Sequence, residues 1–228
     1  MKRSDVNRAI RGAAAAFSEA RVQLPPFAAW RPSDWIEHRR TAPELMKAGL
    51  GWDVVEWCPG DFARRGLVLF TLRNVLRPGK RGARDGYAEK AMVVRLNQQT
   101  PLHAHHRKME DIINRGGGEL VIELHIGPDD RDSRYVLVNG VRKPISHKGA
   151  TVILSPGESI TLVPGVFHAF HAARGDVIAG EVSTHNADDV DNDFLDPVAR
   201  FPDLEEDVPP ERLVVGDYSQ VMSEWGIR

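Results

Sequence analysis

The alternation of apolar and polar residues predicts a helical beginning to the chain. Residues 5–20 have an apolar face at helical spacing behind the possible caps Ser4 and Asp5, which indicates an amphipathic helix. The residues on that face are Val6, Ile10, Ala13 and Phe17. Short helical pieces are also predicted over 33–40 and 42–48. We therefore expect residues 1–65 to form a mostly helical or irregular N-terminal cap.

Beyond residue 66 the pattern changes to short apolar segments separated by turn residues. These segments are GLVLFTLRNV (66–75), AMVVRLN (91–97), ELVIELHI (119–126), RYVLVNG (134–140), ATVIL (150–154), SITLV (159–163) and DVIAGEVS (176–183), with the turn-rich PGKRGARDG (78–86) after the first. Several alternate polar and apolar residues, and none is long enough for a good helix. They predict a mainly β fold, a jelly-roll-like β-barrel.

The pattern contains no linker that would separate the cap from the barrel. The segment from residue 186 is acidic and contains prolines, which favours a covering loop over another strand. We expect a single domain over residues 1–228, with a cap at 1–65, a β-barrel at 66–185 and a C-terminal covering segment at 186–228.

The amino-acid composition limits the kinds of binding partner expected for this protein. A hydrophobic content of 42% supports a substantial core, and a net charge of −2 without a dense basic block gives no bulk attraction to nucleic acid or an anionic membrane. Cys58 is the only cysteine, so an internal disulfide is impossible, and this cysteine content fits a protein of a reducing compartment. The N-terminus lacks a secretory apolar stretch, and no segment has the roughly 18 apolar residues of a membrane helix. We expect a cytoplasmic protein that binds a small molecule.

The stretch PLHAHHRKMEDIINRGGG (101–118) contains the first candidate metal-binding residues. His103 and His105 have the i, i+2 spacing that places both side chains on one face of a strand. Taken alone, such a pair is more often solvent-facing on a sheet edge than a metal site. Glu110 follows closely, and His168 lies in PGESITLVPGVFHAFH after two Pro-Gly turns, which adds a carboxylate and a third imidazole.

Two motifs formed by these residues resemble those of the cupin superfamily. H-x-H-x4-E-x6-G begins at His103, and G-x7-G-x2-H ends at His168, although Pro164 directly precedes Gly165 where the family usually has P-x-G. The resemblance implies that His103, His105, Glu110 and His168 bind a divalent metal inside a β-barrel. Nitrogen and oxygen ligands suit Mn²⁺, Fe²⁺, Co²⁺, Ni²⁺ or Zn²⁺, and four protein ligands leave two adjacent octahedral positions open. Strand alternation excludes His106 and His171 as direct ligands.

A longer resemblance covers nearly the whole chain. The segments LPPFAAW, LGWDVVEW, GLVLFTLRN, AEKAMVVRLNQQTPLHAHHRKMEDIINRGGGEL and GEVSTHNADDVDNDF are similar to the D-lyxose isomerase family of cupins. This resemblance implies metal-dependent interconversion of D-lyxose and D-xylulose, often with D-mannose and D-fructose as a second pair and with Mn²⁺ as the preferred metal.

Three further residues are candidates for the chemistry of such a reaction. Glu181 in GEVS is a candidate general acid/base, with a charged residue on the solvent face as the alternative. Lys108 lies between the histidine pair and Glu110 in the sequence. It is a candidate to polarise the sugar carbonyl, stabilise the enediolate or help ring opening, and a solvated loop lysine is an equally weighted alternative. Lys90 is a candidate substrate-binding lysine, or else protects a strand edge.

Two other groups of residues receive no catalytic role from the sequence. Gly116–Gly118 are expected to form a sharp turn between strands, because no Lys-Ser or Lys-Thr follows them as in a phosphate-binding loop. The acidic residues Asp191, Asp193, Glu205 and Glu206, with Asn192, are expected to belong to a solvated loop, although closure of the barrel mouth is an alternative.

Two rival functions stay open at the level of sequence. An iron-dependent cupin dioxygenase would use the same ligands and would better fit a mainly apolar cavity, and a nonenzymatic cupin would bind sugar without turnover. No helix-turn-helix pattern or basic stripe supports a DNA-binding regulator. A homodimer is expected, since two-fold symmetry is the commonest arrangement.

Overall fold

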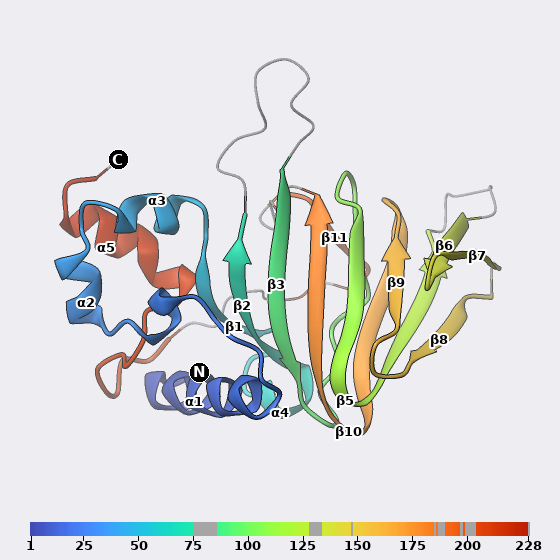
Figure 1. The fold of residues 1–228 in the computed structure, drawn as a ribbon, viewed down its shortest axis with the longest axis horizontal. Coiled ribbons are helices and arrows are strands. Elements are labelled where there is room, and N and C mark those ends of the chain that lie inside the picture. Colours follow the sequence, from blue (N-terminus) through green and yellow to red (C-terminus); the bar gives the residue numbers. More distant parts are fainter. Residues whose placement is uncertain are drawn as a thin grey trace, which may run out of the picture.

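The computed structural model describes residues 1–74, 86–127, 134–146, 148–184, 186, 190–196, 198 and 204–227. The helices are α1 (Arg3–Glu19), α2 (Pro32–Glu37), α3 (Ala42–Lys47), α4 (Phe62–Arg65) and α5 (Tyr218–Glu224), with the 3₁₀ helices η1 (Pro26–Ala29) and η2 (Val215–Asp217). The strands are β1 (Gly51–Glu56), β2 (Gly66–Arg73), β3 (Tyr87–Val94), β4 (His103–His105), β5 (Glu110–Ile126), β6 (Arg134–Val138), β7 (Val141–Ile145), β8 (Ala150–Leu154), β9 (Ser159–Leu162), β10 (Val166–Thr184) and β11 (Asn192–Phe194). The helices gather at one end of the antiparallel sheet, beside β1 (Figure 1).

Two long strands, β5 and β10, join the two halves of the sheet. The first part of β5 pairs with β9 and its second part with β8, while β10 pairs with β5 along most of its length. The second part of β10 also pairs with β3, and its first part contacts β4. Each strand therefore changes neighbours partway along, as in a jelly-roll. This is the mainly β fold, a cupin barrel with an N-terminal helical cap, that the sequence predicts.

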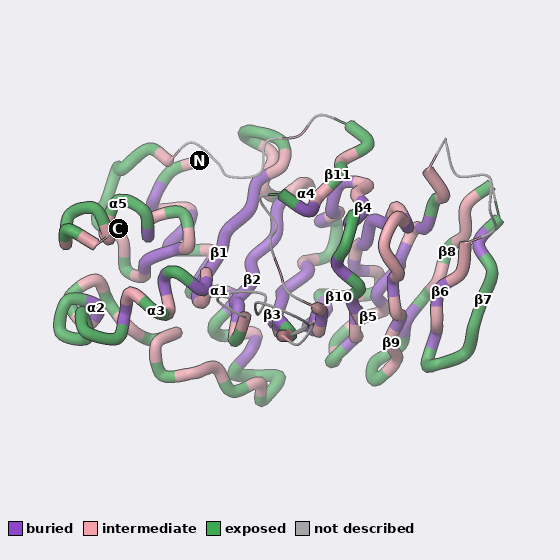
Figure 2. The backbone as a smooth tube through the Cα atoms, turned by 90° about the horizontal axis from the view of Figure 1, so that it is seen from above, coloured by how far each residue is buried: buried purple, intermediate pink, exposed green. Residues whose placement is uncertain are grey.

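The apolar strand β2 has both faces buried, which explains its uninterrupted hydrophobic sequence. Leu67 and Leu69 pack into the barrel core together with residues of β3, β5 and β10. Val68 and Phe70 point the other way and pack against the apolar face of α1. Figure 2 shows buried residues running along the strands and exposed ones on the outer helices and on β7. Helix α1 thus covers the outer face of the sheet.

The helical predictions are confirmed with small shifts at the ends. Helix α1 buries Val6, Ile10, Ala13 and Phe17, the four residues of its predicted face. Helices α2 and α3 occupy the two predicted pieces, and α3 packs with α2 and α5 around Trp35, which is 1% exposed. The described part of the chain contains no helix long and apolar enough to cross a membrane.

The predicted strand segments each contain a strand, but the structure has elements that the sequence analysis missed. Strand β1 lies inside the expected cap, β7 is an additional edge strand, and β11 and α5 lie in the segment expected to be a covering loop. Apart from Gly86, the predicted loop at 78–86 lies outside the described residues.

The prediction of a turn at Gly116–Gly118 is wrong. These glycines lie within β5, opposite a register shift in β10 between Ala173 and Val177. Gly117 has a φ of 95°, and a Cβ on it would stand 2.1 Å from the carbonyl oxygen of Asp176. The glycines permit a close approach of two irregular strands where each changes neighbours, so the chain continues rather than reverses.

Candidate metal centre and active site

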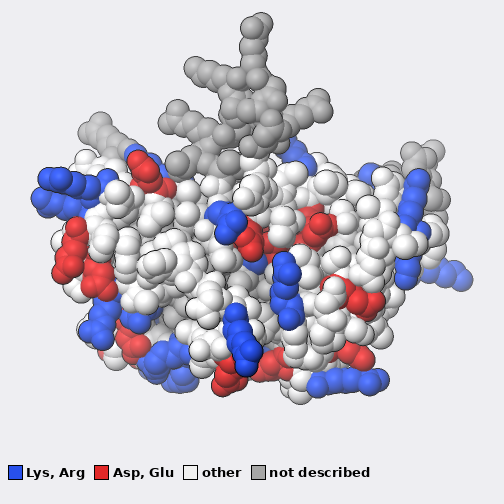
Figure 3. Space-filling view, viewed as in Figure 1, with Lys and Arg blue, Asp and Glu red and all other residues white. Residues whose placement is uncertain are grey.

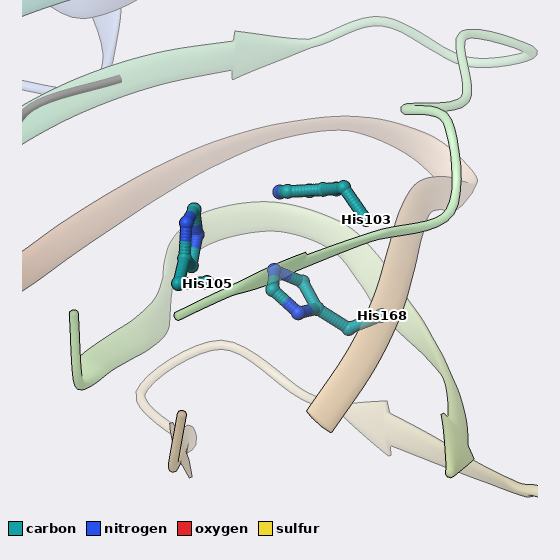
Figure 4. A group of neighbouring side chains, drawn as sticks. All are labelled: His103, His105 and His168. Atoms are coloured by element: carbon teal, nitrogen blue, oxygen red, sulfur yellow. The ribbon is translucent and has the colours of Figure 1, made fainter. Parts of the chain in front are cut away.

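Three imidazoles meet where β4 lies against β10. His103 and His105 project from the same face of β4, and register places His168 of β10 directly opposite His103. Their ligand nitrogens lie within 4.8 Å of one another. Figure 4 shows the three rings turned toward a common space. The i, i+2 spacing therefore works as the sequence predicts, and the alternative of solvent-facing histidines is wrong.

Glu110, the first residue of β5, completes this group. Its Oε1 atom lies 3.2 Å from Nε2 of His105 and 2.9 Å from Nε2 of His168. Glu110, His105 and His168 are 3%, 5% and 1% exposed, respectively. The Glu110 carboxylate on β5 thus lies against two of the three imidazoles, which come from β4 and β10.

The hydrogen bonds around the rings leave atoms aimed at that position without partners. Nδ1 of His103 contacts the Pro101 carbonyl at 2.9 Å, and Nδ1 of His168 contacts the Val166 carbonyl at 3.1 Å. Because a carbonyl only accepts, these Nδ1 atoms donate and each Nε2 keeps a lone pair. Both ring nitrogens of His105, Nε2 of His168 and Oε1 of Glu110 are buried and make no hydrogen bond within the described part of the chain. Nε2 of His168 and Oε1 of Glu110 are thus two buried acceptors 2.9 Å apart with no proton between them, an arrangement that fits a cation.

The electrostatics keep His103 and Glu110 in the forms that bind a cation. Desolvation by the surrounding protein, followed by the neighbouring imidazoles of His168 and His105, lowers the pKa of His103 well below its ordinary value. Burial alone would raise the pKa of Glu110, but the Lys108 ammonium beside it is the largest opposing influence, and the pKa lies well below its usual value. A neutral imidazole and an ionised carboxylate are the ligand forms of these residues.

A second polar group adjoins the first. Register places Lys90 of β3 opposite Glu181 of β10, and their charged groups lie 3.3 Å apart. The ammonium of Lys108 lies 3.0 Å from Oε1 of Glu181 and 2.8 Å from Oε2 of Glu110. The Ser183 hydroxyl donates to the same Oε1 of Glu181 at 3.1 Å. Lys108 therefore connects the group around Glu110 to a second carboxylate that touches none of the imidazoles in the described contacts.

A cavity of about 70 Å³ opens onto both groups. Its charged and imidazole end consists of Lys90, His103, His105, Lys108, Glu110, His168 and Glu181. Its wall is mainly apolar and includes Val55, Trp57, Leu67, Leu69, Met92, Ile112, Phe170 and Phe194. The arrangement can hold a small polar molecule between a cation site and a carboxylate–lysine pair.

All seven candidate residues identified in the sequence line this one cavity. Glu181 lies on the same strand as His168, because the predicted segment 176–183 belongs to the second half of one long strand, β10. Lys108 is 3% exposed, so the alternative of a solvated lysine is wrong. His106 is exposed, and His171 faces Glu123 at 3.7 Å, away from the centre, as predicted.

The C-terminal segment contributes to the cavity, which fits the alternative of closure of the barrel mouth and not the favoured solvated loop. Asn192 and Phe194 of β11 line the cavity, and the Phe194 ring stands 5.7 Å from that of His103 between centroids. No local sequence pattern predicts that these residues form a strand beside the cavity, because β11 is only three residues long and lies in an acidic segment. Asp191, expected in a solvated loop, is 7% exposed.

Comparison with known proteins gives a consistent result. The family model described as D-lyxose isomerase matches residues 1–218. A D-lyxose/D-mannose isomerase of Serratia proteamaculans is 46% identical over 96% of this chain and 98% of its own length. One of Escherichia coli O157:H7 is 43% identical over 96% of this chain and 99% of its own.

Among solved structures, an L-ribose isomerase of Cellulomonas parahominis with L-ribose has a similar fold. The TM-score is 0.57 at 16% identity, covering 90% of this chain and 98% of that one. At this identity the likeness concerns the fold alone, and it agrees with the cupin barrel described above. The match over residues 1–218 and the identities of 46% and 43% show more: the chain belongs to the D-lyxose isomerase family.

Proposed function

We propose that this protein is a metal-dependent aldose–ketose isomerase that interconverts D-lyxose and D-xylulose, with D-mannose and D-fructose as a second pair. The observation that carries the proposal is the shared cavity, in which the imidazole–Glu110 group adjoins Glu181 and two buried lysines. An isomerase that moves the hydrogen as a proton through an enediolate, rather than as a hydride, needs both a site for the sugar oxygens and a separate group that carries the proton. Family membership supports the choice of sugars.

His103, His105, Glu110 and His168 are the proposed ligands of the metal, and Mn²⁺ is the proposed ion. The buried atoms without partners on His105, His168 and Glu110 support this set. A divalent cation bound there supplies Lewis acidity, which stabilises negative charge as it develops on the C1 and C2 oxygens of the sugar.

Glu181 is the proposed general acid/base that moves the proton between C2 and C1. Its carboxylate lies in the cavity and is held by Lys108, Lys90 and Ser183, so it is oriented before substrate enters. Lys108 is proposed to donate to the sugar oxygens during ring opening and enediolate formation, since its ammonium stands between Glu110 and Glu181. Lys90 is proposed to bind substrate hydroxyls from the same side.

The rival functions receive less support. A dioxygenase would favour an apolar cavity throughout. The wall of this cavity is mainly apolar, but Lys90, Lys108 and Glu181 make the end beside the imidazoles charged. A binding protein without turnover would not need an oriented carboxylate that is separate from the metal ligands. Membership of an isomerase family supports the isomerase over both.

We also propose a homodimer in the cytoplasm that acts on small molecules only. The single cysteine fits a reducing compartment, and the face in Figure 3 has Lys and Arg side chains interspersed with Asp and Glu rather than a basic patch. Sedimentation or light scattering of the purified protein measures the mass and tests the dimer.

The experiment that tests the function is formation of D-xylulose from D-lyxose by metal-stripped protein, with and without added Mn²⁺. Glu181→Gln keeps the shape of the side chain but removes the base, so turnover should fall by about 10²- to 10⁴-fold while metal binding remains. Glu19→Gln makes the same chemical change at the exposed end of α1 and should leave turnover intact. Absence of turnover with every divalent metal and aldose tested would sink the proposal, and oxygen uptake would then test the dioxygenase.

A further inference from the structure

The strand that carries His103 and His105 is short and is held from both sides. Strand β4 contacts β10 on one side, and β11 pairs with it on the other through Asn192↔His105, Asp193↔Ala104 and Phe194↔His103. A further bond from Leu195 N to the Leu102 carbonyl, at 3.1 Å, extends this ladder. Without β11, the two histidines would stand on a three-residue edge strand. The C-terminal segment is therefore part of the support of the centre.

Asp191, the residue just before β11, binds the loop that follows β4. Its carboxylate accepts hydrogen bonds from the backbone N–H of Arg107 at 3.0 Å and of Lys108 at 2.9 Å. Its own carbonyl accepts from the N–H of His106 at 3.3 Å. One residue thus satisfies three consecutive backbone donors. Such bonds to a carboxylate are stronger than bonds to a neutral acceptor, and Asp191 is shielded from water at 7% exposure.

The loop held in this way presents Lys108 to the cavity. From this backbone the Lys108 ammonium reaches Oε2 of Glu110 at 2.8 Å and Oε1 of Glu181 at 3.0 Å. Asp191 does not line the cavity, so its carboxylate influences the reacting groups through the loop backbone rather than by contact.

We propose that Asp191 is a positioning residue for Lys108: it fixes the backbone of residues 106–108 so that the ammonium stays between Glu110 and Glu181. The role assigned to Lys108 rests on the proposed function, whereas the constraint on the loop does not. Bond geometry in the site must hold within a fraction of an ångström for full activity, and a loop gives such precision only when its backbone is tied. Asp191 provides that tie from a segment more than eighty residues away in sequence.

Asp191→Asn tests the proposal with little change of shape. Asparagine keeps one acceptor but places an NH₂ group where the other N–H of the loop needs an acceptor. The matched control is Asp193→Asn, which removes the same charge two residues later, at an exposed position whose pairing with β4 uses the backbone. Amide hydrogen exchange of the 106–108 loop, Mn²⁺ affinity and steady-state kinetics are measured for both variants and the wild type.

We expect the loop amides to exchange at least about tenfold faster in Asp191→Asn, and kcat to fall by about 10- to 100-fold, as loss of a hydrogen bond to a charged group predicts. KM and Mn²⁺ affinity should stay within about threefold, because the proposed metal ligands are untouched. Asp193→Asn should match the wild type. In a Lys108→Met background, Asp191→Asn should cause little further loss of kcat, since the effect passes through Lys108.

Two results would overturn the proposal: unchanged loop exchange in Asp191→Asn, or a loss of kcat that is fully additive with Lys108→Met. If Asp191→Asn does not fold, amide hydrogen exchange of the wild type tests the proposal instead. Unprotected amides at Arg107 and Lys108 would contradict their hydrogen bonds to the Asp191 carboxylate directly. Should the wild type turn over no aldose, the proposed function fails, but the exchange measurement still tests whether Asp191 holds the loop.

Discussion

Replacement of Lys108 by methionine should affect the stability of the metal-free protein and its response to metal in opposite directions. The Lys108 ammonium lies 2.8 Å from Glu110 and 3.0 Å from Glu181, and all three groups are buried. Without the ammonium, Lys90 remains beside Glu181, but Glu110 faces only imidazoles in the described contacts. A buried carboxylate is then left without its nearest counter-charge.

The magnitude follows from the geometry. Two unit charges 2.8 Å apart interact by about 6 kcal/mol at an effective dielectric constant of about 20, and removal of one partner of a buried pair typically costs about 3–5 kcal/mol. In a chain of 228 residues this loss lowers the melting temperature by about 6–20 °C. Added Mn²⁺ should raise the melting temperature of the variant by more than that of the wild type, because the cation replaces the missing counter-charge of Glu110.

Thermal unfolding of chelator-treated protein, with and without Mn²⁺, measures both effects. Lys148→Met, at an exposed position, should change the free energy of unfolding by no more than about 0.5 kcal/mol. Equal melting temperatures for metal-free Lys108→Met and the wild type would refute the account of the buried charges. A smaller Mn²⁺ shift in the variant than in the wild type would refute the placement of the metal beside Glu110.

The remaining predictions concern the framework. Gly117→Ala should destabilise strongly, since its Cβ would meet the Asp176 carbonyl oxygen at 2.1 Å, and thermal unfolding measures the loss. Arg3→Met should lower the free energy of unfolding by about 1.5–3 kcal/mol, because Arg3 donates to Glu206 at 2.6 Å and to Asp217 at 2.7 Å. The hydrogen bond from Arg3 lowers the pKa of Glu206 below its ordinary 4.5, so this carboxylate stabilises the fold above that pH and ceases to do so as the pH falls through its lower folded value. The stability difference between wild type and Arg3→Met, measured by denaturant titration, should therefore narrow below about pH 4.5; a constant difference would contradict the pairing.

The candidate site was predictable from the sequence where spacing determines direction. The i, i+2 pair His103 and His105 had to share a face of any strand. The resemblance to the two cupin motifs implied that Glu110 and His168 lie beside them, and Glu110 lies 2.9 Å from His168. Residues whose position depends on the register between strands were harder to place from the sequence. Lys90 and Glu181 are opposite each other because of how β3 pairs with β10, and no local pattern contains that pairing.

The errors in the fold have a similar origin. Glycines are typical of turns, but those at 116–118 serve a close approach to β10, a tertiary contact that local propensity does not contain. The acidic composition around Asp191 favours a solvated loop, yet its carboxylate is buried by backbone donors more than eighty residues earlier in the chain. Strand β1 was not predicted for a local reason: its neighbours in sequence are helical and its apolar run is short.

The division of the cavity between strands has a consequence for how its selectivity can change over evolutionary time. The residues that β1 and β2 supply to the cavity wall, Val55, Leu67 and Leu69, are all apolar, while the imidazoles, carboxylates and lysines come from β3, β4, β5, β10 and the loop after β4. Substitutions at these three positions therefore reshape the cavity without replacing any of its charged residues. We expect mutations at Val55, Leu67 and Leu69 to change which small molecules fit the cavity while its imidazoles, carboxylates and lysines stay in place, and a laboratory library confined to these positions tests this expectation.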